Sequence, residues 1–141
     1  MILVDTNVLS ELMLMRPHSG VQAWFDRQIS SKLHTSTITI AEILYGLRIM
    51  PAGQRRDGLR VRFEPFLREM FGHRILGFDE AAARGYGDIM GERKEMGRPM
   101  SIPDGQIAAI ARANYLALAT RNIRDFQGIG LDLINPFDGA A

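Results

Sequence analysis

The chain of 141 residues contains no cysteine and only two lysines, and its longest uninterrupted apolar runs are five residues long. The absence of cysteine excludes disulfides, thiolate zinc sites and cysteine nucleophiles. No apolar run approaches the roughly 20 residues that a membrane-spanning helix needs. The first nine residues carry Asp5 and no basic residue, which is unlike a secretory signal. These features predict a cytoplasmic protein without a membrane segment.

Several catalytic signatures are also missing. The three histidines, His18, His34 and His73, do not have the spacing of zinc ligands, and no serine lies in a GxSxG motif. The glycine-rich loops that bind nucleotides, GxxxxGK[ST] and GxGxxG, are absent. With 46% hydrophobic and 23% charged residues, the composition is typical of a folded protein, and the length predicts one domain over residues 1–141.

Positive charge is concentrated in one part of the chain. Residues 48–74 contain seven arginines and three acids, a local charge of +4, although the whole chain carries only +1. Arginine binds phosphate and carboxylate groups through two parallel hydrogen bonds. This cluster is compatible with a phosphate-bearing partner and equally with a solvated helix face.

Short apolar or β-branched segments alternate with segments of helical periodicity. The alternation predicts parallel strands joined by helical crossovers, with ligands bound beyond the carboxyl ends of the strands. The predicted strands are 1–4, 34–37, 74–78, 116–120 and 131–134. The predicted helices begin at Val8 or cover 21–29, 40–47, 54–71, 79–95 and 104–114, with a short turn near Ile123.

Four polar side chains with carboxylate or amide groups follow predicted strands, namely Asp5, Glu42, Asn122 and Asp125, and Asp104 occupies the first turn of its own predicted helix. In a parallel sheet these groups converge on one edge. Each also has a structural explanation, because Asp5 and Asn122 suit helix N-caps and Asp125 suits a first turn. The segments Thr39–Glu42 and Ser101–Asp104 both have the spacing of a capping box.

Two features favour a shared site. Glu42 is the only charge on a helical segment that is otherwise apolar, which predicts a buried carboxylate in need of a partner. Clustered carboxylates also repel one another unless a cation neutralises them. Oxygen ligands without His or Cys suit Mg²⁺, with Mn²⁺ as the alternative, and such metals commonly serve phosphodiester hydrolysis.

The motifs around these residues resemble a known family. Asp5-Thr6-Asn7, "TSTITIAE" ending at Glu42, "SIPDGQIAA" around Asp104 and "LATRNIRDF" from Leu118 are similar, in order and spacing, to the PIN domain. "EILYGL", "PAGQRR", "FDEAAA" and "NPF" resemble more narrowly the FitB-like branch of VapC-type toxins from bacterial toxin–antitoxin systems. The similarity extends from Met1 to about Phe137.

The resemblance implies an αβα sandwich with a four- to five-stranded parallel sheet and a Mg²⁺-dependent endoribonuclease activity. The family's invariant acids correspond to Asp5, Glu42 and Asp104, all in or beside the metal site. The fourth position departs from the pattern, because Asn122 stands where some PIN domains have Asp, and Asp125 is the alternative ligand. Ligand-orienting roles fall to Thr6, Asn7 and Thr120, and a contact with RNA phosphate falls to Arg121.

The same resemblance implies two protein partners, a cognate antitoxin and a second copy of the chain in a homodimer. An antitoxin segment would contact apolar anchors in a groove beside the Arg-rich region, namely Leu12, Met13, Met15, Leu44 and Leu47. Two other functions remain open. One is a degenerate PIN domain that binds RNA or protein without cutting, and the other is a phosphatase with Asp5 as nucleophile, a pattern in which an acid is expected where Asn7 stands.

Overall fold

The computed structural model describes residues 1–138 and contains one five-stranded parallel sheet in the order β3-β2-β1-β4-β5. The strands are β1 (Ile2–Val4), β2 (Leu33–Ser36), β3 (Ile75–Leu76), β4 (Ala117–Ala119) and β5 (Leu133–Ile134). The α-helices are α1 (Thr6–Leu12), α2 (Ser19–Asp26), α3 (Thr37–Ile49), α4 (Gln54–Phe71), α5 (Glu80–Glu95) and α6 (Ile102–Ala113). Three short 3-10 helices are η1 (Ser30–Lys32), η2 (Ile123–Phe126) and η3 (Pro136–Asp138).

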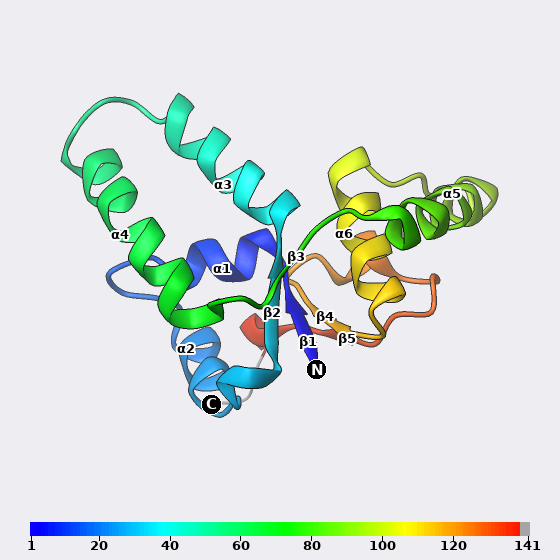
Figure 1. The fold of residues 1–141 in the computed structure, drawn as a ribbon, viewed down its shortest axis with the longest axis horizontal. Coiled ribbons are helices and arrows are strands. Elements are labelled where there is room, and N and C mark those ends of the chain that lie inside the picture. Colours follow the sequence, from blue (N-terminus) through cyan, green and yellow to red (C-terminus); the bar gives the residue numbers. More distant parts are fainter. Residues whose placement is uncertain (139–141) are drawn as a thin grey trace.

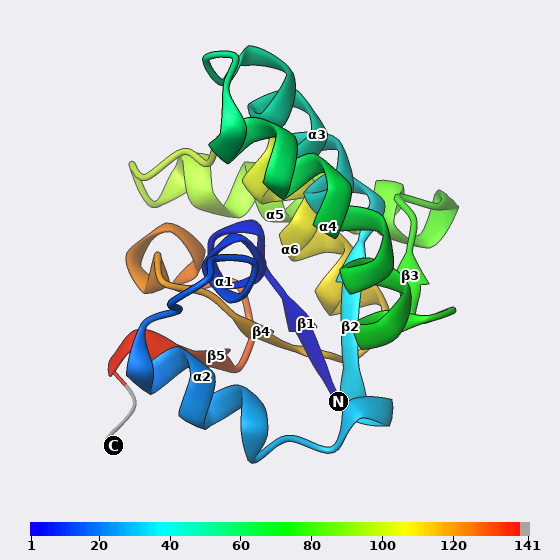
Figure 2. The same cartoon turned by 90° about the vertical axis from the view of Figure 1, so that its left-hand side faces the viewer.

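Helices cover both faces of the sheet. Successive side chains of a strand point to opposite faces, so Leu3 joins the apolar cluster under α5 and α6, whereas Val4 joins the cluster under α1, α2 and α4. Figure 1 shows these two groups of helices on either side of the sheet, and Figure 2 looks onto the side covered by α1, α2 and α4. The predicted αβα sandwich with five parallel strands is therefore confirmed.

Most predicted elements are present, with boundaries shifted by a few residues. The first helix begins at Thr6 rather than Val8, because the chain turns directly after Asp5. The second helix ends at Asp26, so Ile29 lies outside it and is exposed. Asp79 and Ser101 cap α5 and α6, accepting hydrogen bonds from the Ala82 and Asp104 N–H groups.

Two predictions about the segment that carries Glu42 are wrong. Helix α3 begins at Thr37 and is capped by Ser36, whose side chain accepts from the Thr39 N–H, so Thr39 and Glu42 do not form a capping box. The helix is also not buried on all sides. Leu44, Tyr45 and Ile49 on α3 are 50%, 67% and 63% exposed, which leaves an apolar face of this helix without contacts inside the described chain.

The strand order places a topological switch between β1 and β4. Strands β1, β2 and β3 extend the sheet in one direction, and β4 and β5 extend it in the other. In open parallel sheets, ligands bind where the strand order reverses, beyond the carboxyl ends of the strands. Asp5 and Thr120 lie at this point, one residue beyond β1 and β4. Within residues 1–138, no helix has the length and apolar character needed to cross a membrane.

Candidate active site

Asp5 lies at the switch point and is almost completely buried, with 3% of its surface exposed. Its backbone N–H donates to the Ala119 carbonyl (2.9 Å), which continues the sheet. Its Oδ1 accepts from the Thr6 N–H (2.8 Å), and its Oδ2 accepts from Thr120 Oγ1 (2.8 Å) and Asn7 Nδ2 (3.3 Å). An ordinary N-cap accepts from the second or third helical N–H. The carboxylate of Asp5 is therefore held by groups from two strand ends rather than by a standard cap.

Glu42 reaches the same region from α3. Thr6 Oγ1 lies 2.7 Å from Glu42 Oε1 and 3.1 Å from Thr39 Oγ1, and Thr39 in turn contacts Ser36 Oγ (3.3 Å). Thr39 is fully buried. This hydroxyl network connects the ends of β1 and β2, and it fixes the direction of Glu42. Sequence reasoning assigned Thr39 to a capping box and overlooked Ser36.

Asp104 is contributed by the first turn of α6. The hydroxyl of Ser101 accepts from the Asp104 backbone N–H (3.3 Å), so the predicted cap at this helix start is confirmed. Helix α6 is closely packed against α5 beside this residue, because a Cβ at Gly105 would lie 2.5 Å from Met90 Sδ. The absence of a side chain at Gly105 therefore permits the helix contact that positions Asp104.

The loop after β4 carries the two candidates for the fourth position. Asn122 is the N-cap residue of η2, but its side chain makes no capping hydrogen bond. Its backbone N–H donates to Thr120 Oγ1 (3.1 Å). Asp125 lies in the first turn of η2 and is exposed. The Arg121 N–H donates to Asn7 Oδ1 (3.1 Å), which ties this loop to the residues around Asp5.

Arg93 on α5 supports this loop from behind, and sequence reasoning missed it. Its guanidinium is 3% exposed and donates to three carbonyls, those of Arg98 (2.7 Å), Arg124 (3.3 Å) and Gln127 (2.8 Å). A buried charge requires such hydrogen bonds. On the sequence, Arg93 is one of many helix arginines, and no local pattern distinguishes it from those on the surface.

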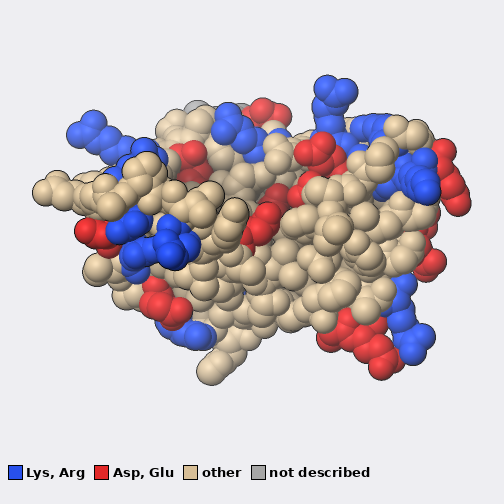
Figure 3. All heavy atoms as spheres, turned by 90° about the horizontal axis from the view of Figure 1, so that it is seen from above, with Lys and Arg blue, Asp and Glu red and all other residues tan. Residues whose placement is uncertain are grey.

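The acidic side chains interact through their charges. Burial raises the pKa of Asp5 from 3.8 to about 6, hydrogen bonds from Thr120 and Thr6 oppose the rise, and the charges of Asp104 and Glu42 add to it. Burial also raises the pKa of Asp104, with the charges of Asp125 and Glu42 adding and Ser101 and Arg93 opposing. Seen from above (Figure 3), acidic groups gather in a hollow between the two groups of helices that cover the faces of the sheet, and basic groups lie around it.

The chemistry of this donor set fits Mg²⁺ or Mn²⁺ rather than a metal that needs a complete protein cage. Among residues 1–138, no three His, Asp or Glu side chains stand close enough together to hold a metal ion directly. Mg²⁺ retains several waters and is commonly bound through only one or two carboxylates. Buried Asp5, with its raised pKa and acidic neighbours, is the kind of carboxylate that a divalent cation stabilises in its ionised form.

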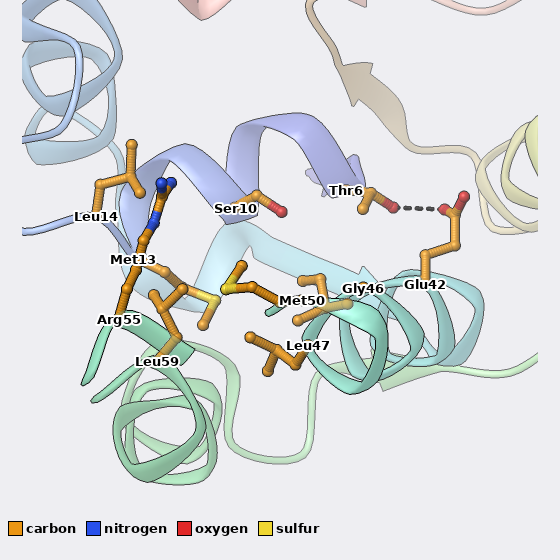
Figure 4. A pocket seen from close by; sticks show the side chains of 11 residues that line it. Thr6, Ser10, Met13, Leu14, Glu42, Gly46, Leu47, Met50, Arg55 and Leu59 are labelled. Carbon is orange, nitrogen blue, oxygen red and sulfur yellow. Dashed lines mark hydrogen bonds between the residues drawn. The ribbon is translucent and has the colours of Figure 1, made fainter. Parts of the chain in front are cut away.

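A cavity of about 250 Å³ adjoins Glu42 and is bounded by α1, α3 and α4. Figure 4 shows Glu42 at one end of it, and Arg55 near Met13 and Leu14 at the other. Of the predicted groove residues, Met13 and Leu47 line this cavity, and Leu12 and Met15 line an adjoining hollow with Arg62 and Phe66. Leu44 does not line either of them. It is 50% exposed, whereas the lining residues Ile43 and Leu47 are 7% and 6% exposed.

Comparison with known proteins agrees with this fold. A family profile described as "PIN domain" matches residues 2–130, so the chain belongs to the PIN-domain family. Within that family it resembles VapC- and FitB-type toxins. It is 43% identical to "VapC ribonuclease Y4jK" of Sinorhizobium fredii, over 99% of this chain and all of that protein. It is 41% identical to "Plasmid stability protein StbB" of Pseudomonas syringae pv. tomato, over 98% and 99% of the two chains.

A solved structure has the same fold. The crystal structure of FitAcB from Neisseria gonorrhoeae contains a chain that matches with a TM-score of 0.89 and 36% sequence identity, over 97% of this chain and 99% of that one. The predicted membership of the PIN family, with its FitB-like and VapC-type relatives, is therefore confirmed.

Proposed function

We propose that this protein is a Mg²⁺-dependent endoribonuclease and the toxin of a toxin–antitoxin pair, acting in the cytoplasm. The observation that carries the proposal is a buried carboxylate, Asp5, at the switch point of the sheet, where burial raises its pKa to about 6 and the nearby charges of Asp104 and Glu42 add to the rise. Similarity over almost the whole chain to a protein named as a VapC ribonuclease supports RNA as the substrate class.

In this mechanism Asp5 and Asp104 would hold the metal, and either Asp125 or Asn122 would complete the set. A bound Mg²⁺ activates water and offsets the negative charge that develops on the scissile phosphate. Glu42, held by the Thr6 hydroxyl at 2.7 Å, either contributes to the metal site or orients the attacking water by accepting a hydrogen bond. Asn7 and Thr120 hold the carboxylate of Asp5 in one orientation, and Arg121 contacts a flanking phosphate.

The test is RNA cleavage by the purified chain freed of any partner, in EDTA, Mg²⁺ and Mn²⁺. We expect cleavage only with a divalent metal, and its loss in Asp5→Asn, Glu42→Gln and Asp104→Asn. Asp88→Asn is the matched control, because Asp88 is an exposed acid on α5. Equal cleavage by Asp104→Asn and the unaltered protein would contradict the proposal, since it would indicate a contaminating nuclease.

One observation favours a second candidate, a binding module that holds RNA without cutting it. No three acids within residues 1–138 already form a compact metal-binding group, and Asn122 is neutral at the variable position. RNA binding without cleavage in either metal, by a folded protein, would favour this candidate. The structure offers no comparable support for a phosphatase, because that pattern expects an acid where Asn7 stands, and Asn7 instead donates to Asp5 Oδ2 (3.3 Å) and accepts from the Arg121 N–H (3.1 Å).

The antitoxin is proposed to occupy the cavity between α1, α3 and α4. Apolar side chains of Met13, Leu47, Met50 and Leu59 offer contacts for a partner's apolar residues, and Glu42 at one end offers an ion-pair partner for a basic side chain. The supporting comparison is that matching solved structures include toxin–antitoxin complexes. Gly46 also lines this cavity and has open space where a Cβ would lie, so Gly46→Arg is expected to abolish binding of the co-expressed antitoxin while RNA cleavage persists.

A homodimer is proposed through the exposed apolar face of α3, formed by Leu44, Tyr45 and Ile49. Burying such a face against a second copy removes apolar surface from water. Light scattering after size-exclusion chromatography is expected to give a dimeric mass for the unaltered protein and a monomeric mass for Tyr45→Glu. A monomer at all concentrations in the unaltered protein would contradict this assignment.

A further inference from the structure

The loop between β4 and β5 borders a second cavity beside the acidic site. This cavity has a volume of about 390 Å³ and is lined by residues 121–125, Asn135 and Asp138. Asn122 and Asp125, the candidates for the fourth position of the acidic site, belong to its lining. The Asn122 N–H donates to Thr120 Oγ1, which donates to Asp5 Oδ2, so two hydrogen bonds connect the lining of this cavity to the carboxylate of Asp5.

We propose that this cavity is a subsite for one nucleotide of the RNA strand, with Arg121 and Arg124 holding the backbone phosphate at its rim. The inference rests on the proposed nuclease function, which it extends by assigning the side of the molecule along which the substrate passes.

Both arginines are available for a phosphate. Within the described chain, neither Arg121 nor Arg124 forms an ion pair with a carboxylate, although Asp125 and Asp138 line the same cavity. The Arg121 guanidinium lies 4.5 Å from the centre of the Phe137 ring. Stacking of this kind uses the face of the guanidinium and leaves its N–H edges free to bind phosphate oxygens in pairs.

The platform under these arginines is fixed before any substrate arrives. On one side, the Arg121 and Asn122 N–H groups donate to Asn7 Oδ1 and Thr120 Oγ1, both at 3.1 Å. On the other, Arg93 and Arg98 donate to the Arg124 carbonyl, at 3.3 and 3.1 Å. A loop held from both sides loses little conformational entropy when it binds, which favours affinity.

The charges within the cavity also set the orientation of the nucleotide. Asp125 and Asp138 repel a phosphate, so the phosphate belongs beside the arginines and the neutral base or ribose beside the two acids. The side-chain oxygen of Asn135 accepts from the Phe137 N–H (3.0 Å), which leaves its amide N–H groups for the nucleotide. The Asn122 side chain makes no capping bond and offers a second amide.

The test measures binding separately from cleavage. A fluorescein-labelled single-stranded RNA of about 12 nucleotides is titrated by anisotropy in EDTA with protein carrying Asp104→Asn, at several salt concentrations. In that background, Arg121→Ala and Arg124→Ala are each expected to weaken binding 5- to 20-fold. Each is also expected to lower the slope of log K against log salt by about 0.7, the value for one phosphate contact on a single strand.

Arg62→Ala is the matched control. Arg62 is an exposed arginine on α4, and it lines a different hollow, together with Leu14 and Met15. Its substitution is expected to leave RNA affinity unchanged. Unaltered binding in both Arg121→Ala and Arg124→Ala, or a loss of the same size in Arg62→Ala, would overturn the subsite. Absence of any RNA binding by the parent protein would overturn it as well.

A second variant separates the stacked geometry from charge alone. Arg121→Lys keeps the positive charge but loses the planar fork that stacks on Phe137. We expect weaker binding with an unchanged salt slope, and thermal unfolding is measured for every variant to confirm the fold. If the unaltered protein does not cleave RNA but Arg121→Ala still weakens binding, the nuclease proposal fails and the subsite stands. If the unaltered protein cleaves RNA and the arginine variants bind RNA normally, the nuclease proposal stands and the subsite fails.

Discussion

Replacing Asp5 with Asn tests whether the acidic site is held in an unfavourable state of charge. Burial raises the pKa of Asp5 from 3.8 to about 6. Between these two values the folded chain retains a proton that the unfolded chain has lost, so the free energy of unfolding falls as the pH rises. At about 1.4 kcal/mol for each pKa unit, ionised Asp5 costs roughly 3 kcal/mol of stability above pH 7.

Urea unfolding in EDTA at pH values from 4 to 7.5 measures this cost. The stability of Asp5→Asn relative to the unaltered protein is expected to rise by roughly 2.5 kcal/mol across this range, because Asn cannot ionise. Taking the difference between the two proteins removes titrations that they share. One of these is His34, where burial and the charges of Arg74 and the N-terminus lower the pKa. Below pH 6.5 this histidine favours the unfolded chain and opposes the effect of Asp5.

Addition of Mg²⁺ at pH 7.5 is the second arm of this experiment. A cation that binds the folded chain at 100 times its Kd stabilises it by about 2.7 kcal/mol. The unaltered protein is expected to gain stability with Mg²⁺, and Asp5→Asn is expected to gain much less. A stability difference that stays constant from pH 4 to 7.5 would refute the reasoning about burial, whatever the effect of the metal.

Three further substitutions test how local structure supports the site. Thr6→Val removes the hydroxyl that lies 2.7 Å from Glu42 Oε1, so we expect the free energy of unfolding in urea to fall by about 1 kcal/mol and RNA cleavage to slow. Thr6→Ser keeps a hydroxyl and should match the unaltered protein in both measurements. Gly105→Leu places a side chain where a Cβ already lies 2.5 Å from Met90 Sδ, and should lower the unfolding free energy by about 1–3 kcal/mol. Tyr115 has φ of 56° and is 94% exposed, so Tyr115→Gly should raise stability by about 0.5–1 kcal/mol, and a decrease in melting temperature would contradict this.

The arrangement of strands was predictable because it follows from local pattern. A short, continuously apolar strand followed at once by Asp5 places that residue at the end of β1, and parallel pairing then brings the other strand ends to the same edge. Asp104 follows no strand, and its position depends on the packing of α6 against α5. The roles of Asp5, Glu42 and Asp104 in catalysis are still predictions, which the cleavage experiment tests.

Other features depend on contacts that no local pattern contains. The same four-residue spacing predicted capping boxes at Thr39 and at Ser101, but only Ser101 caps a helix, because Ser36 begins α3 one turn earlier. Leu44 was expected in the groove, but it is 50% exposed and lines neither hollow, because which residues of an apolar helix become buried depends on the tertiary packing of that helix. The buried position of Arg93 likewise depends on carbonyls more than 30 residues away in sequence, those of Arg124 and Gln127.

The competing explanations for Asp5, structural cap or site residue, prove not to exclude each other. Its Oδ1 accepts from the first helical N–H, while its Oδ2 is held by Thr120 and Asn7. A residue required only as a cap would be more stable in solvent, where its carboxylate pays no desolvation cost. Asp5 is instead only 3% exposed, and this burial, together with the charges of Asp104 and Glu42, raises its pKa. Since such an arrangement is unfavourable for the isolated chain, a cation or a partner's basic group is the physical means of relieving it.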